Sequence, residues 1–208
     1  MLKIYYQYIK MEGLILFYIH IICYWTMVFL YDKNVPKIDY ENAIVNSLKN
    51  QILFTLPSTL ILGHYYPIQY NNFFSSLIYF PILIVSSDCY FYISHRPLHT
   101  NWFYHLHKHH HTGSVHVAKS LDADGLEHIF GNLGSFVIGI LLLWYYGIII
   151  NFYTICSWVG LATINTCISH SNGNCYLDTR KHLLHHKYRK CNYGFGFYLL
   201  DRITGTYK

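Results

Sequence analysis

Three histidine clusters have the residue type and the spacing of metal ligands. They are an H-x-x-x-H pair, His95 and His99, and two copies of H-x-x-H-H, His107/His110/His111 and His182/His185/His186. On a helix, residues at i, i+3 and i+4 lie on one face, so each triplet spans an arc of about 100°. Imidazole is a good ligand for iron, zinc, copper and nickel. The repeat therefore predicts that two segments far apart in the chain offer the same three-histidine face to a metal site.

A run of histidines can also be an incidental metal-binding tract. His105 and His109 point to the other side of the first predicted helix, and we interpret them as outer or solvated residues. The clusters lack the Gly and Ser filler of low-complexity tracts, and the spacing occurs twice, which favours a defined site. His20 and His64, in or between apolar runs, are interpreted as partnered polar residues.

The composition is typical of a membrane protein. Hydrophobic residues make up 53% of the 208 residues and charged residues only 12%, and the mean hydropathy is +0.20. The net charge of +5 is modest, and the basic residues do not alternate with stacking aromatics, which argues against nucleic acid as a partner. The six cysteines form no C-x-x-C pair, so we interpret them as small buried hydrophobes. The length favours one domain, residues 1–208.

Long uncharged runs predict an all-α integral membrane protein with about four transmembrane helices. Residues 13–31 and 73–93 are each long enough to cross a bilayer of about 30 Å, and residues 128–177 can hold two further spans around a turn near Gly147. Residues 51–62 are too short to cross fully, and five spans are the alternative. The expected division is an N-terminal span and connection (1–72) followed by a core (73–208).

The two-span hairpin brings the chain back to its starting side, so the downstream triplet can meet His95 to His111 in a helical cap on one membrane face. The chain after Tyr176 is basic, and Lys3 and Lys10 precede the first span. By the positive-inside rule, these charges predict that the histidine cap and both termini are cytosolic.

The order of these motifs around a membrane hairpin resembles the fatty acid hydroxylase superfamily, which includes sterol desaturases, C4-methylsterol oxidases and hydroxylases of fatty acids and sphingolipids. Residues 88–96, 107–111, 170–172, 192–194 and 201–207 also look like family signatures, and the resemblance runs from about residue 73 to the end. It implies two iron ions that activate O2, held by the eight clustered histidines with His170 as a ninth. Zinc could replace iron in purified protein.

The resemblance further implies a membrane lipid substrate, electrons from cytochrome b5 and its NAD(P)H-dependent reductase, and location in the endoplasmic reticulum. The chain itself has no G-x-G-x-x-G fingerprint for a flavin or nicotinamide. The sequence does not distinguish hydroxylation from desaturation. It also does not distinguish a sterol substrate from an acyl chain or a sphingolipid. No oligomeric state is indicated.

One position departs from the family pattern. Where the family commonly has an A-H-P-x-E-type motif, this chain has Asp124 in place of the histidine and Gly125 in place of the proline, before Glu127 and His128. Asp124 could ligate a metal, or it could mark an inactive paralogue that serves as a lipid-binding or scaffold protein. Asp88, Glu127 and His128 are candidates for a ligand or for a group that orients a ligand, and Asp88 could equally sit at the membrane surface. A metal transporter is disfavoured, since the clusters lie outside the spans.

Overall fold

The computed structural model describes residues 11–33, 35–171 and 180–208, and the regular secondary structure of these residues is entirely helical. This confirms the all-α prediction. The helices are α1 (Met11–Tyr31), α2 (Lys37–Asn50), α3 (Leu56–Tyr65), α4 (Phe73–Ser76), α5 (Phe80–Leu98), α6 (Tyr104–His107), α7 (Gly125–Glu127), α8 (Gly134–Tyr145), α9 (Phe152–His170), α10 (Arg180–Tyr188) and α11 (Leu199–Thr204).

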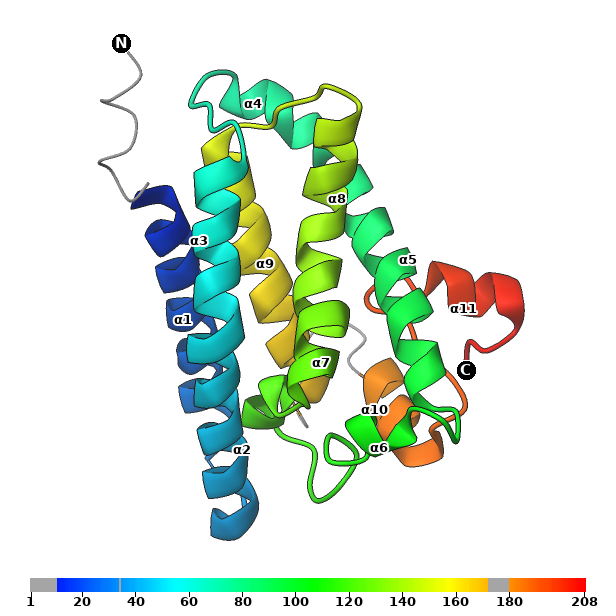
Figure 1. Ribbon diagram of the computed structural model, residues 1–208. Helices are drawn as coiled ribbons and strands as arrows, with labels where there is room; N and C mark the ends of the chain where they lie inside the picture. Colours follow the sequence, from blue (N-terminus) through cyan, green and yellow to red (C-terminus); the bar gives the residue numbers. More distant parts are fainter. Residues whose placement is uncertain (1–10, 34, 172–179) are drawn as a thin grey trace.

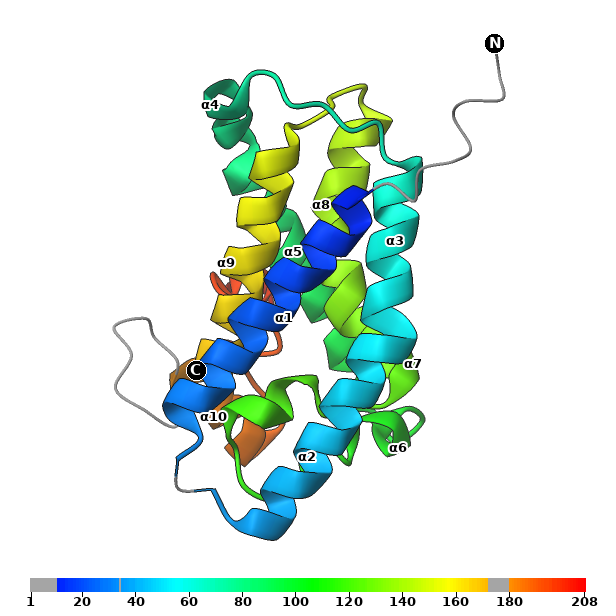
Figure 2. The same cartoon turned by 90° about the vertical axis from the view of Figure 1, so that its left-hand side faces the viewer.

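The long helices stand side by side, while α6, α7 and α10 gather at one end of the bundle and α4 lies at the other (Figures 1 and 2). The closest pairs are α1 with α9, α5 with α8, and α1 with α3. Glycine permits the last of these contacts, because a Cβ added to Gly63 would lie 2.5 Å from the backbone nitrogen of Gly13. Two hydrophobic clusters fill the bundle, one around Tyr66 and Trp158 and one around Tyr24 and Val117.

Within the described residues, three segments are long and apolar enough to span a membrane: Met11–Tyr31, Phe73–Leu98 and Gly125–Tyr145. The predicted count of four spans is therefore not confirmed. The difference lies in α9, the second half of the predicted hairpin, which carries Thr, Ser, Asn and His side chains between its apolar residues. Some of these polar groups find partners inside the protein, as in the bond of 3.0 Å between Thr163 Oγ1 and His20 Nδ1.

Residues 51–62 do not form an isolated short element. The π-helical turn Gln51–Thr55 joins α2 and α3 into one helical run, which returns along α1 to its starting end (Figure 1). The chain thus passes along the bundle in α1, α3 and α5 before it reaches His95. The start of α1 and the histidine helices consequently lie at opposite ends, and not at the same end as predicted. Lys3 and Lys10 lie outside the described residues.

Many large apolar side chains face outward, as expected of a surface that contacts lipid. Phe29, Phe74 and Ile78 are examples, with exposed fractions of 78%, 83% and 73%. The cysteines within the described residues, Cys23, Cys89, Cys156, Cys167 and Cys191, are free thiols, while Cys175 lies outside those residues.

Candidate metal centre

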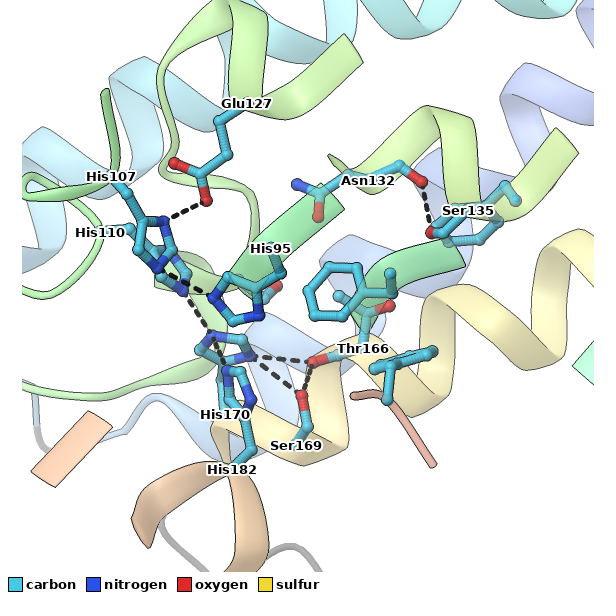
Figure 3. Close-up of a pocket in the computed structure, with 14 residues that line it drawn as sticks. His95, His107, His110, Glu127, Asn132, Ser135, Thr166, Ser169, His170 and His182 are labelled. Carbon is cyan, nitrogen blue, oxygen red and sulfur yellow. Dashed lines mark hydrogen bonds and ion pairs between the residues drawn. The ribbon is translucent and has the colours of Figure 1, made fainter. Parts of the chain in front are cut away.

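Histidines at the ends of several helices lie close together at one end of the bundle. His95 comes from the last turn of α5 and His99 directly follows that helix. His107, His110 and His111 come from α6 and the turn after it, His170 from the end of α9, and His182, His185 and His186 from α10. Figure 3 shows five of these rings, those of His95, His107, His110, His170 and His182. The structure therefore brings together all nine histidines that the sequence analysis singled out. Chain segments up to 91 positions apart meet there.

The nine histidines separate into two groups. One contains His95, His99, His107, His111 and His185, and the other contains His110, His170, His182 and His186. In each group, one nitrogen per ring lies within 4.8 Å of one such nitrogen of every other member. The H-x-x-H-H triplets are split between the groups: in the first triplet His107 and His111 belong to one group and His110 to the other. Each triplet thus contributes to both groups.

Ring nitrogens face each other within each group. The Nε2 atoms of His95 and His111 lie 3.0 and 2.9 Å from Nε2 of His107, while those of His110 and His182 both lie 3.2 Å from Nε2 of His170. These contacts need not be hydrogen bonds, because a neutral imidazole has one donor nitrogen and one acceptor nitrogen. The Nδ1 atoms then decide which nitrogen carries the proton.

Those Nδ1 atoms lie against acceptors outside the groups. The acceptors are the backbone carbonyls of Tyr193 (2.9 Å from His95), Cys191 (2.8 Å from His185), Thr166 (3.1 Å from His170) and Asp122 (3.3 Å from His110), and the Glu127 carboxylate (2.7 Å from His107). A carbonyl cannot donate, so the Nδ1 atoms of the four rings bonded to carbonyls are protonated and their Nε2 atoms present lone pairs. The Glu127 carboxyl fixes the same tautomer of His107 when it is ionised. Lone pairs that converge on one point are satisfied by a cation.

Buried nitrogens without a partner support the same interpretation. Among the described residues, Nε2 of His185 and Nε2 of His186 are buried and have no hydrogen-bond partner. A buried polar atom left unpaired is costly unless something else satisfies it. The donor set is therefore suited to two metal ions, one in each group.

The electrostatic environment keeps these rings neutral. Burial, with smaller contributions from neighbouring histidines and from Arg189, lowers the pKa of His99 to about 3 and that of His111 to about 2. Burial likewise lowers the pKa of His185 to about 4. An imidazole must be neutral to bind a metal, so these side chains are in the ligating form at neutral pH.

A small cavity of about 20 Å³ adjoins both groups and has room for about one water-sized molecule. His95, His107, His110, His170 and His182 line it together with Asn132, Thr166 and three phenylalanines (Figure 3). The cavity gives a small molecule access to the point where the rings converge.

The sequence profile described as fatty acid hydroxylase matches residues 80–206, which is more than half of the chain. This chain belongs to the fatty acid hydroxylase family. No curated protein and no solved structure matches it significantly. The family segment begins at α5 and contains all nine clustered histidines, whereas α1, α2 and α3 lie outside it.

Two carboxylates have roles that the sequence left open. Asp88 is neither beside a ligand ring nor at the surface: it is 1% exposed and accepts backbone N–H groups of Phe195, Tyr198 and Leu199 at 2.8 to 3.0 Å. It anchors the segment that carries the Tyr193 carbonyl to the helix that carries His95. Glu127 accepts a hydrogen bond from His107 and so orients that ring.

The other two candidates are not part of the histidine groups. Asp124 is exposed, and its carboxylate caps α7 by accepting the backbone N–H of Leu126 at 2.9 Å. A side chain bound at the start of its own helix, facing solvent, is not a ligand here. His128 is buried, but its ring nitrogens contact Thr55 Oγ1 at 2.9 Å and Asn132 Nδ2 at 3.3 Å.

Sequence reasoning missed the backbone acceptors, because carbonyl oxygens have no signature in the residue type. It also missed Asp122, whose carboxylate contacts His109 at 2.8 Å and Lys119 at 3.2 Å while its carbonyl accepts from His110. His109 is thus an outer residue, as predicted, and it is half exposed.

Proposed function

We propose that this protein is a membrane-bound di-iron oxygenase that hydroxylates or desaturates a lipid, using O2 and electrons from an external donor. The observation that supports it most is the pair of adjacent imidazole groups, with their lone pairs directed inward, in a fatty acid hydroxylase family chain with apolar spans. When bound, two iron ions would supply O2 reduction and attack on an unactivated C–H bond.

The chain's own residues position and insulate the metals. Hydrogen bonds at five Nδ1 atoms fix the tautomer and the orientation of five rings. The Nε2 atoms of these rings are thereby held in position to bind a metal. Phe91, Phe136 and Phe195 line the cavity beside the rings and limit the access of water. The two histidine groups lie at one end of the membrane spans. A lipid can therefore reach them while its apolar part stays beside the apolar helices.

The electron donor belongs to the proposal as well. We propose a cytochrome b5-type donor with its NAD(P)H-dependent reductase, and a cytosolic histidine face at the endoplasmic reticulum. The basic residues on and after α10 provide a surface that an acidic donor can approach, although anionic lipid head groups would be attracted to the same charges. Replacing Lys187, Arg189 and Lys190 with glutamine should lower donor-dependent turnover. Unchanged turnover would remove the docking role.

Lipid mass spectrometry tests the activity. Cells that supply an endoplasmic reticulum electron donor would express the wild-type chain, a His110→Ala/His111→Ala variant, or a His105→Ala control, whose exposed ring lies outside both groups. We expect a product one oxygen atom heavier, or two hydrogen atoms lighter, with the wild type and the control only. No product in any of them, with folded and metal-loaded protein, would contradict the proposal.

The alternative of an inactive paralogue rested on Asp124 alone. Because that side chain caps α7 outside the histidine groups, its replacement of a family histidine leaves both groups intact. No described residue now favours the inactive alternative.

A further inference from the structure

A larger cavity of about 430 Å³ lies between α1, α3, α8 and α9 and opens at the outer surface of the bundle, where Ile61 and Tyr65 of its lining are exposed. Most of its lining is apolar; Leu16, Leu62, Tyr66, Ile140, Trp144 and Val159 are representative. Leu62 and Trp144 lie near the ends of α3 and α8 that are remote from the histidine groups (Figure 1). The size and lining suit the hydrocarbon body of a lipid.

The lining also contains a few polar side chains: His20, Thr55, Ser58, Thr59, His128 and Asn132. His128 is satisfied on both ring nitrogens by Thr55 and Asn132. His20 is only 5% exposed, and its Nδ1 bonds Thr163 Oγ1 at 3.0 Å, but its Nε2 has no partner among the described residues. Because His20 lines an apolar cavity and one of its ring nitrogens is buried without a partner, this region points to a polar group on a ligand.

This polar part of the cavity is the part nearest the metal centre. Asn132 and Phe136 line both the large cavity and the small cavity beside the histidines. Thr163, the partner of His20, lies one helical turn before Thr166, whose carbonyl accepts from His170. A ligand bonded to His20 therefore has its polar end close to the metal groups and its apolar body extended away from them.

We propose that this cavity holds the substrate, that the substrate is a lipid with a hydroxyl group at one end of an apolar body, and that this hydroxyl hydrogen-bonds Nε2 of His20. A hydroxyl both donates and accepts, so it pairs with either tautomer of His20. The carbon that is oxidised then lies within a few bonds of the hydroxyl, and not far along the hydrocarbon. The binding itself is independent of the proposed function, whereas the substrate role rests on it.

The reaction balances with the reagents already named. In hydroxylation, a C–H bond near the hydroxyl becomes C–O–H; one oxygen atom of O2 enters the lipid, and the other leaves as water with two electrons from the donor and two protons. In desaturation, two hydrogens leave the lipid and both oxygen atoms become water, again with two donor electrons and two protons.

A second cavity, of about 400 Å³, also reaches the metal centre, through Ser169 and Phe195. It lies between α5, α9 and the segment before α11. Among the described residues, no buried polar atom of its lining lacks a partner, and the Ser169 hydroxyl donates to the Thr166 carbonyl at 2.7 Å. It therefore lacks the feature that selects a hydroxyl group.

Matched probes test the binding. Purified, metal-loaded protein in detergent would be titrated with cholesterol against cholestane, and with 1-hexadecanol against hexadecane, and affinity read from the shift of the melting temperature. In at least one pair, the alcohol should bind about tenfold more tightly than its hydrocarbon twin, the value expected for one buried hydrogen bond. The preference should vanish in His20→Leu and persist in His64→Leu, whose exposed ring does not line the cavity.

Equal affinity within both pairs in the wild type, or a preference that survives in His20→Leu, would overturn the inference. If His20→Leu does not fold, His20→Gln, which keeps a polar group, should retain part of the preference, and Val137→Trp, which fills the cavity, should abolish binding. The His110→Ala/His111→Ala variant should keep the preference without turnover. Product formation without any preference would contradict the cavity assignment alone, whereas a preference without product would contradict the proposed function alone.

Discussion

The five-histidine and four-histidine groups differ in how fully protein ligands can surround a metal. The first group offers one more imidazole, and three of its rings are fixed by Tyr193, Cys191 and Glu127. The second has two rings fixed, by the carbonyls of Asp122 and Thr166. Three of its four rings line the small cavity, against two of five in the first group.

This difference indicates that the two groups have different roles. The four-histidine group would leave a metal more coordination positions for molecules other than protein, and most of its rings line the small cavity. A metal in the five-histidine group is more nearly enclosed. We therefore expect the loss of one ligand to be more damaging in the four-histidine group.

Single alanine substitutions should show the largest effect. His182→Ala removes one of four ligands and should lower turnover at least about 100-fold, with loss of one metal ion per chain. His99→Ala leaves four imidazoles in its group, so the metal should stay bound and turnover should fall only about tenfold. Metal analysis and product quantification measure both. Equal losses in the two variants would break the comparison.

Glu127→Gln should act on one group only. The amide can still accept from His107 but no longer supplies a negative charge, so metal affinity in the five-histidine group should fall by about 10-fold to 100-fold. A chelator titration should then show one metal ion removed early and the other at the wild-type chelator concentration. Simultaneous release of both ions would contradict the separation of the two groups.

Acid should destabilise the metal-free protein. The pKa values of His99, His111 and His185 are lowered to about 3, 2 and 4 in the folded state, whereas an unfolded chain binds these protons below about 6.5. Because the unfolded state binds more protons in that range, the stability present above about pH 6.5 is lost as the pH falls toward 4. Denaturant midpoints of metal-free protein at several pH values between about 7.5 and 5 measure it. A constant midpoint would show that these rings are solvated.

Asp124→Ala should have the smallest effect. Loss of the α7 cap should cost about 1 kcal/mol, without change in metal content or in product. Asp124→Asn, which keeps a capping oxygen, is the matched control. Loss of a metal ion in Asp124→Ala would indicate that Asp124 is a metal ligand.

The histidines were predictable because their spacing is local, although the expected helix ends at His107 and a turn carries His110 and His111. Their division between two groups was not, since it depends on how α10 meets α5. Nor were the roles of Asp88 and Asp124, because a carboxylate can bind a metal, a ring or a backbone N–H with similar chemistry. The count of four spans was not confirmed at α9, where polar residues interrupt the apolar pattern and some of them bond inside the protein, as Thr163 does to His20.

Nine histidines that form two metal sites should hold two ions, so the number of metal ions per chain is the most direct test. We predict about two ions in purified wild-type protein, about two in the exposed-ring control His105→Ala, and about one in His182→Ala/His186→Ala, which keeps the five-histidine group whole. One ion or fewer in folded wild-type protein supplied with metal, or two in the double variant, would contradict the account.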